Sequence, residues 1–583
     1  MRLFGRIIFI ILAIIGGLVL LISGFGTVVA MKKQSLPNQM VLMLNLNKGV
    51  LETESTGLIT QLNQNDAYVL KNLIETLDRA SRDPKVTALV ARIDSVPISI
   101  TKSQEIRDAI QAFRKSNKRT IFYSSGFEEN SNGTINYYLA SAFQEIWIQP
   151  SGIVGLTGFI TESPFFKDTL DMLGIKADFM ARHEYKSAIE PLMKKQFTKE
   201  SRESLKMILD SWSNQTIAGI ANNRSLSTSH VKMLIDRAPL LAYEAKNSGL
   251  IDRLAYWDEI EKELNKEVIK FVDIRNYEKM LDIEPNAVKV ALIYGTGIVQ
   301  HDEVKNQLTN ENVMSSKRII KAFRDAIKDS EVKAILFRIN SPGGSYSASD
   351  SIWREVGNAR AAGKPVIVSM GDVAASGGYF VAMAADRIIA EPGTITGSIG
   401  VFMGKIVLVD FWKKLGISWD EIHTGKNSTL LSNNSSFSST ERDRMNAILD
   451  FIYNDFLQKV QHARKLKSKD MDKIARGRIW SGNEAMRIGL IDQTGGYDVA
   501  IKHIRELTNS SSQTPINLVQ FPSTKKSLEY LMDMIHGQLP EDLIRAFTLE
   551  TRLLRLISCL KTIVGLDVTS NSQKLLMMPV ELK

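Results

Sequence analysis

Two glycine-containing runs in the second half of the chain hold the residues whose types and spacing could do chemistry. The first is Ser341-Pro342-Gly343-Gly344, and the second is Ala375-Ser376-Gly377-Gly378. Each run follows an apolar segment that is typical of a buried strand, residues 334–337 and 366–368. A serine among small residues can attack a carbonyl group, and glycine N–H groups can stabilise the oxyanion that forms. The pair of runs therefore predicts acyl transfer, although a single glycine run after a strand is usually only a turn.

The composition predicts a globular protein of several domains without a metal or cofactor. The chain has 583 residues, of which 44% are hydrophobic and 23% charged. Its formal charge of +9 is interleaved with acidic residues and forms no basic stripe with aromatics, so we expect no nucleic-acid partner. The single cysteine, Cys559, excludes an intrachain disulfide, and the seven histidines show no metal-ligand spacing.

The N-terminus predicts a membrane anchor. Residues 7–31 contain no charged side chain and are bounded by Arg6 and Lys32. Such a segment is long enough to cross a bilayer, which takes about 20 residues, whereas the core of a cleavable signal is usually about 7–15. We therefore expect a short cytoplasmic N-terminus at residues 1–6, a transmembrane helix at 7–31 and the bulk of the chain outside the cytoplasm. Cleavage after Val28-Val29-Ala30 stays open as an alternative.

The second half of the chain repeats the first. Residues 90–95 match 336–341, which are 246 positions further on, and Pro150 matches Pro392, which is 242 positions further on. Offsets that drift so little indicate tandem duplication. We place the repeats at residues 38–282 and 287–508, with a tail at 515–583.

Each repeat should be an α/β domain with a parallel sheet. In the second repeat, apolar segments typical of strands at 288–293, 334–339 and 366–370 alternate with segments typical of helices at 315–328 and 347–361. Strand–helix alternation of this kind is typical of crossover units.

The first repeat lacks the residues that carry the chemistry. Thr134 stands at the position of Ser376, and Val96-Pro97-Ile98 stands opposite Pro342-Gly343-Gly344. We therefore expect one catalytic site per chain.

A nucleophilic serine needs a base, and three residues are candidates for that role. His423 is the only histidine between Arg387 and His462, and no acid partner can be named for it. A buried lysine with a depressed pKa is the alternative, which leaves Lys186 in the first repeat and Lys426 in the second. When residues 197–200 are matched to 439–442, Lys186 falls opposite Ser428 and Lys426 misses that position by two residues.

Three motifs resemble the signal peptide peptidase A family, also called protease IV. The run from Gly371 to Tyr379 resembles the nucleophile motif of the family, and Thr396-Gly397-Ser398-Ile399-Gly400 resembles the motif downstream of it. Tyr185-Lys186-Ser187-Ala188 resembles the base motif. The resemblance covers nearly the whole chain and fits the long, two-repeat form of the family.

The resemblance implies a function, a fold and roles for individual residues. The fold would be two tandem Clp-protease/crotonase-like domains, and the function would be that of a membrane-anchored serine peptidase of the inner (cytoplasmic) membrane. Its bulk would lie on the periplasmic side, where a homotetramer would degrade cleaved signal peptides. The implied roles are Ser376 as nucleophile, Lys186 as general base, Ser398 as a hydrogen-bond partner of the lysine amine, Gly344 and Gly377 as oxyanion donors, and Gly343 as the residue that shapes the turn. Because the short form of the family carries its lysine after the serine, Lys426 stays a rival base.

Two other functions and the role of the tail stay open. A crotonase-like acyl-CoA enzyme would use carboxylates at the site, and a membrane scaffold would use no catalytic pair. In the tail, apolar residues at 553–564 recur at helical spacing among basic ones, which predicts a helix. We expect it to contact another subunit, with packing on its own domain or a membrane-facing rim as alternatives.

Overall fold

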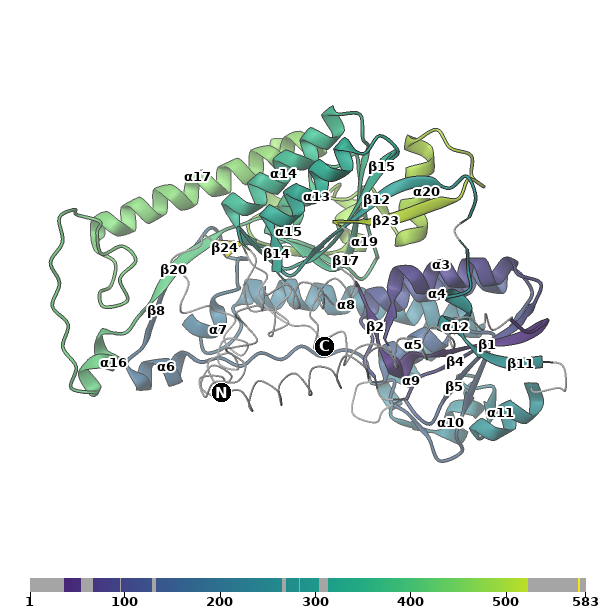
Figure 1. The fold of residues 1–583 in the computed structure, drawn as a ribbon. Helices are drawn as coiled ribbons and strands as arrows, with labels where there is room; N and C mark the ends of the chain where they lie inside the picture. The colour runs from purple at the N-terminus through teal and green to yellow at the C-terminus, as the bar shows by residue number, and fades with distance from the viewer. Residues whose placement is uncertain are drawn as a thin grey trace, which may run out of the picture.

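The computed structural model describes residues 36–53, 67–94, 96–127, 133–264, 269–282, 284–302, 313–522 and 575–576. These residues form an α/β protein with one mainly parallel sheet in each repeat (Figure 1). The predicted anchor at residues 7–31 and the predicted tail helix at residues 553–564 lie outside them. Within the described ranges, no helix has the length and apolarity that crossing a membrane would require.

The first repeat is built on a six-stranded parallel sheet with the order β10-β6-β5-β4-β1-β11. Its strands are β1 (Gln39–Asn45), β4 (Val86–Arg92), β5 (Arg119–Ser124), β6 (Glu145–Ile148), β10 (Arg253–Leu254) and β11 (Ile269–Asp273). The middle strands are almost entirely buried, as expected when helices cover both faces of a parallel sheet.

The second repeat follows the same strand order, β22-β18-β17-β15-β12-β23. Its strands are β12 (Val288–Thr296), β15 (Ala334–Ser341), β17 (Val366–Ala375), β18 (Arg387–Ala390), β22 (Gln493–Thr494) and β23 (Ile516–Phe521). Two further strands, β19 (Ile395–Gly397) and β21 (Ile479–Ser481), continue the sheet from the end of β17. The two sheets correspond strand by strand, which confirms the tandem duplication.

One boundary inferred from the sequence is wrong. The start of the predicted helical tail is a strand, since β23 pairs with β12 from Val288↔Ile516 to Ile293↔Phe521. It corresponds to β11 of the first repeat. An edge strand that is only half-buried carries a weak hydrophobic pattern, so its place in the sheet comes from long-range pairing.

Helices of the first repeat pack between the two sheets. Buried residues of α3 (Leu70–Arg82) and α4 (Ile100–Arg114) belong to the same apolar cluster as Leu336 of β15 and Ile367 of β17. The repeats therefore share a core, and groups on α4 lie behind the strands of the second repeat.

A third sheet also joins the repeats. Strand β8 (Lys176–Ala181) of the first repeat pairs antiparallel with β20 (Phe402–Val407) of the second, in register from Lys176↔Val407 to Ala181↔Phe402. With α6 (Lys167–Leu173) and α16 (Val409–Lys414) these strands form an arm that projects from the body (Figure 1). Between β16 (Gly344–Ser345) and β20 lies β24 (Leu575–Leu576), antiparallel to both.

Candidate active site

Ser376 sits at a sharp strand-to-helix turn. Strand β17 ends at Ala375, and Ser376 is the N-cap of α15 (Gly377–Ala382) with φ 55° and ψ −115°, a conformation that side-chain-bearing residues rarely adopt. Its N–H donates to the carbonyl of Gly397 at 2.8 Å, which fixes the turn. A Cβ on Gly378 would lie 2.6 Å from the carbonyl oxygen of Ser341, so this position needs glycine for the close approach.

Lys186 reaches this serine from the other repeat. It lies in the loop between β8 and α7 (Glu190–Met193), and the pairing of β8 with β20 brings that loop to the second repeat. Its Nζ donates to Ser376 Oγ at 2.8 Å and to Ser398 Oγ at 3.0 Å, and it lies 3.1 Å from the carbonyl oxygen of Ser398. Lys186 is only 3% exposed, and this burial lowers the pKa of its amine well below the ordinary lysine value.

Ser398 is held in a left-handed turn beside the amine. Gly397 has φ 79° and Ser398 has φ 51°, so the chain reverses directly after β19. Because Ser398 is fully buried, its two oxygen atoms offer the lysine amine partners that water would otherwise provide.

The predicted oxyanion glycines lie next to each other. Gly343 and Gly344 have φ 110° and φ 154°, and a Cβ on Gly344 would lie 2.2 Å from the carbonyl oxygen of Val299. A Cβ on Gly377 would lie 3.0 Å from the amide nitrogen of Gly344. The two runs singled out in the sequence therefore meet at the end of the β15–β17 strand pair.

The rival bases are not brought to Ser376. Both Lys426 and His423 are exposed on the loop that follows α16, and His423 Nδ1 lies 4.0 Å from a carboxylate oxygen of Glu421. The alignment that placed Ser428 opposite Lys186 is nevertheless wrong. Helices α8 (Lys199–Arg224) and α17 (Ser439–Arg464) begin after the N-caps Thr198 and Ser438, which are 240 positions apart.

This offset makes Lys426 the counterpart of Lys186 along the chain. Ser438, Ser439 and Thr440 are all capping residue types, so sequence alone could not fix where α17 begins. The two lysines differ in their surroundings: Lys186 is buried against the opposite repeat, whereas Lys426 is exposed.

The degenerate position has a structural role. Thr134 is fully buried at the start of α5 (Thr134–Ala140), and its hydroxyl accepts a hydrogen bond from the N–H of Gly158 at 2.9 Å.

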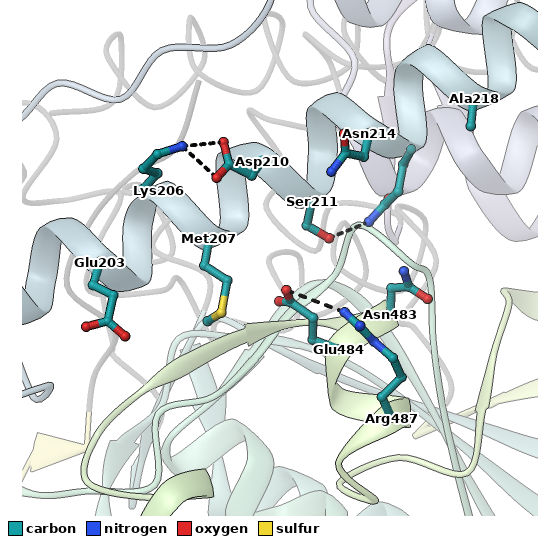
Figure 2. A pocket seen from close by; sticks show the side chains of 11 residues that line it. Glu203, Lys206, Met207, Asp210, Ser211, Asn214, Ala218, Asn483, Glu484 and Arg487 are labelled. Atoms are coloured by element: carbon teal, nitrogen blue, oxygen red, sulfur yellow. Dashed lines mark hydrogen bonds and ion pairs between the residues drawn. The ribbon is translucent and has the colours of Figure 1, made fainter. Parts of the chain in front are cut away.

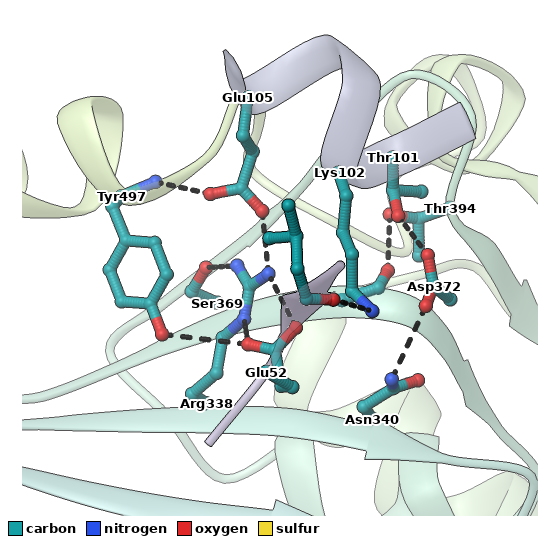
Figure 3. A network of polar contacts seen from close by, with 12 residues as sticks. Glu52, Thr101, Lys102, Glu105, Arg338, Asn340, Ser369, Asp372, Thr394 and Tyr497 are labelled. Atoms are coloured by element: carbon teal, nitrogen blue, oxygen red, sulfur yellow. Dashed lines mark hydrogen bonds and ion pairs between the residues drawn. The ribbon is translucent and has the colours of Figure 1, made fainter. Parts of the chain in front are cut away.

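A buried ionic network links the two repeats (Figure 3). Arg338 of β15 is fully buried and donates to both carboxylate oxygens of Glu52, at 2.6 and 3.3 Å, and to Glu105 at 2.5 Å. It also donates to Ser369 Oγ at 2.8 Å and lies 4.6 Å from the ring centroid of Tyr497. Burial raises the pKa of Glu105 to about 7, with Arg338 opposing the rise and the charge of Glu52 adding to it.

A second set of polar contacts joins α4 of the first repeat to β15 and β17 of the second, near the ends of those two strands. Thr101 of α4 donates to Asp372 of β17, and Asn340 of β15 donates to the other oxygen of Asp372 at 3.4 Å. Neither set of contacts was predicted from the sequence. Arg338 within an otherwise apolar strand was the available signal, because a buried arginine requires partners.

The pocket in Figure 2, of about 660 Å³, lies apart from these residues, between α8 and α19 (Gly482–Arg487). Most of the residues that line it have polar or charged side chains, Glu203 and Arg487 among them.

A serine hydroxyl in contact with a buried lysine amine, beside two glycine turns, is an arrangement that fits acyl transfer by a serine hydrolase. The comparison with protein families makes the class definite: this protein is a serine peptidase. The chain belongs to peptidase family S49, whose model matches residues 112–269 and 358–511, one segment in each repeat.

Curated relatives match most of the chain. It is 30% identical to the "Serine protease SPPA, chloroplastic" of Arabidopsis thaliana over 81% of this chain and 70% of that protein. It is 29% identical to "Protease 4" of Salmonella typhi over 82% of this chain and 79% of the relative. It is also 29% identical to "Protease 4" of Haemophilus influenzae, over 83% of this chain and 82% of that relative.

Among solved structures, a mutant of ClpP1 from Listeria monocytogenes matches 35% of this chain and 91% of its own, with 15% identity and a TM-score of 0.24. That score is too low to assign a common fold.

Proposed function

We propose that this protein is a membrane-anchored serine endopeptidase that degrades cleaved signal peptides and other short apolar peptides with a Ser376–Lys186 dyad. The observation that carries the proposal is the 2.8 Å contact between Lys186 Nζ and Ser376 Oγ in a buried setting. Because burial lowers the pKa of Lys186, its amine can be neutral at working pH and can take the serine proton through this contact.

The reaction would proceed through an acyl-enzyme. Ser376 Oγ attacks the peptide carbonyl carbon as its proton passes to Lys186, and the N–H groups of Gly344 and Gly377 stabilise the oxyanion. Lys186 then gives the proton to the leaving amine. Lys186 is then neutral again and takes a proton from the water molecule that attacks the acyl-enzyme ester. As the ester bond to Ser376 Oγ breaks, Lys186 gives this proton to the serine oxygen. Ser398 would keep the amine in place throughout.

An extended peptide fits the strands around the site. The pairing of β24 with both β16 and β20 supports this, since a two-residue extended segment already forms ladder contacts beside Gly344. A substrate that binds in the same way would be held by hydrogen bonds to its backbone.

The finer parts of the proposal rest on family membership and on the sequence. They are a Clp-protease/crotonase-type fold for each repeat, an uncleaved anchor at residues 7–31, residence in the inner (cytoplasmic) membrane with the bulk on the periplasmic side, and assembly as a homotetramer to which the tail contributes. The acyl-CoA enzyme and the scaffold are disfavoured, because Ser376 contacts an amine and the chain belongs to a peptidase family.

Cleavage of a synthetic signal peptide by the full chain in detergent micelles tests the proposal. Chromatography of the products should show cleavage by the wild type and none by Ser376→Ala. The matched control is Thr134→Ser, which alters the corresponding position of the first repeat and should retain the wild-type rate. Cleavage by Ser376→Ala at the wild-type rate would overturn the assignment of the nucleophile.

A further inference from the structure

The backbone of Lys186 is pressed against a glycine of the second repeat. Gly477 lies between α18 (Ser468–Ile474) and β21 with φ 86°, and a Cβ there would be 2.5 Å from the amide nitrogen of Lys186 and 2.7 Å from its Cα. A side chain at this position would push the lysine backbone away. Residues 475–478, here named the clamp segment, therefore close directly over the loop that carries the base.

The clamp segment also holds the residue that accepts from the lysine amine. The N–H of Gly477 donates to the carbonyl of Ile399 at 2.8 Å, and the N–H of Ser398 donates to the carbonyl of Arg478 at 2.8 Å. One short segment thus sets the positions of both the Lys186 backbone and the Ser398 turn.

Two arginines of the clamp segment anchor the residues just before Lys186. Arg476 pairs with Glu184, with 2.9 Å between Nη2 and Oε1. Arg478 lies 4.1 Å from the ring centroid of Tyr185, donates to its hydroxyl, and pairs with Glu203 of α8 at 2.7 Å. The Tyr185 hydroxyl in turn donates to Glu203 at 3.1 Å. Both anchors join the first repeat to the second.

We propose that the clamp segment is a positioning device for the general base, in which the Arg476–Glu184 and Arg478–Tyr185–Glu203 contacts hold Lys186 Nζ on Ser376 and keep water away from the amine. This inference rests on the proposed serine–lysine chemistry. Neither arginine contacts Ser376, so both act through the placement of Lys186. A loosened clamp would admit water, which favours the charged ammonium, and would lengthen the contact with Ser376.

Charge reversal at the first anchor tests the proposal. The side chains of Arg476 and Glu184 are 35% and 37% exposed, and Asp472, which pairs with Arg476 at 3.2 Å, is 70% exposed. Water therefore screens a substituted charge at either position, including that of a glutamate at position 476 facing Asp472. The variants are Glu184→Arg, Arg476→Glu and the double swap. For each, the experiment measures the rate at which a fluorophosphonate labels Ser376 between pH 6 and 10, and the thermal unfolding midpoint. Each single variant should lose on the order of 10- to 100-fold in rate at neutral pH, and its pH–rate midpoint should rise. The double swap, which restores an ion pair, should recover the rate to within a few fold.

A matched control separates positioning from general damage. Arg487→Ala removes an arginine that is 66% exposed and 3.7 Å from Glu484, on the wall of the pocket in Figure 2. It should leave the pH–rate profile unchanged. If a charge reversal prevents folding, Arg478→Lys and Glu203→Gln test the second anchor with smaller changes and the same expected direction.

The proposal is overturned if folded single variants keep the wild-type pH–rate profile, or if the double swap is as slow as the single variants. Failure of the proposed function gives a different result, since Lys186→Met would then acylate at the wild-type rate whatever the clamp segment does.

Discussion

Replacement of Arg338 by methionine should destabilise the protein strongly at alkaline pH and much less at acidic pH. The change removes the cation that Glu52 and Glu105 share, with Arg338–carboxylate distances of 2.6 and 2.5 Å, while methionine fills much of the volume. Breaking a buried ion pair by removal of one partner typically costs about 3–5 kcal/mol, because a buried charge is left uncompensated. We expect a loss of that size in the free energy of unfolding at pH 8.

The pH dependence follows from the raised carboxyl pKa. In the wild type, burial already raises the pKa of Glu105 to about 7, and the variant lacks the Arg338 cation that opposes this rise, so the pKa of Glu105 rises further. A carboxyl with a raised folded pKa is most stabilising when protonated, so its contribution is present at low pH and is lost as the pH rises through that pKa. Between its unfolded and folded pKa values, one such carboxyl adds about 1.4 kcal/mol to the free energy of unfolding for each unit by which the pH falls. The cost of Arg338→Met should therefore shrink by on the order of 1–3 kcal/mol between pH 8 and pH 6.

Urea unfolding of the full chain, followed by fluorescence of its seven tryptophans, measures this cost at both pH values. The triple variant Arg338→Met/Glu52→Gln/Glu105→Gln is the control, because it removes both charges and should recover most of the stability. A cost below about 1 kcal/mol at pH 8, an equal cost at pH 6, or a triple variant as unstable as the single one would refute the reasoning.

Three further predictions concern the site itself. Ser398→Ala removes the acceptor at 3.0 Å but leaves the carbonyl oxygen at 3.1 Å, so kcat/KM for peptide cleavage should fall by no more than about tenfold, with folding unchanged on thermal melting. Gly344→Ala places a Cβ 2.2 Å from Val299 O and should displace an oxyanion donor, lowering kcat on the order of 10²–10³-fold in the same assay. Wild-type turnover by that variant would exclude Gly344 from the oxyanion site. Lys186→Met should abolish turnover yet raise the thermal midpoint, more at pH 6 than at pH 9, because a buried lysine with a depressed pKa must release a proton on folding, which costs more at low pH. An equal effect at both pH values would mean that Lys186 is charged in the folded protein.

The sequence predicted the α/β class and the two repeats because the patterns that indicate them are local. Alternation of apolar and amphipathic segments predicted the strands and helices of the second repeat, and the duplication extended the topology to the first. The ends of the strands were predicted less well. The predicted strands at 334–339 and 366–370 continue to Ser341 in β15 and to Ala375 in β17, because Ser341 still pairs with Ala374.

What the sequence could not predict depends on contacts between distant segments. The antiparallel pairing of β8 with β20 crosses from one repeat to the other and leaves no local pattern. Lys186 was identified by its motif alone, because its burial comes from the opposite repeat. Gly477 and the arginines on either side of it match no motif, and only the structure shows that Gly477 lies against the Lys186 backbone and that the arginines contact Glu184 and Tyr185.

The most direct test of the account is the pH dependence of Ser376 acylation. Intact-mass and peptide mass spectrometry of the full chain treated with a fluorophosphonate gives both the site and the rate, for the wild type and for the permanently charged Lys186→Arg. We predict a single label on Ser376, a rate that rises with pH to a plateau whose midpoint lies below the ordinary lysine pKa of about 10.4, and no measurable rate for folded Lys186→Arg. Labelling of Lys186→Arg at the wild-type rate, or labelling of the wild type at another residue, would contradict the account.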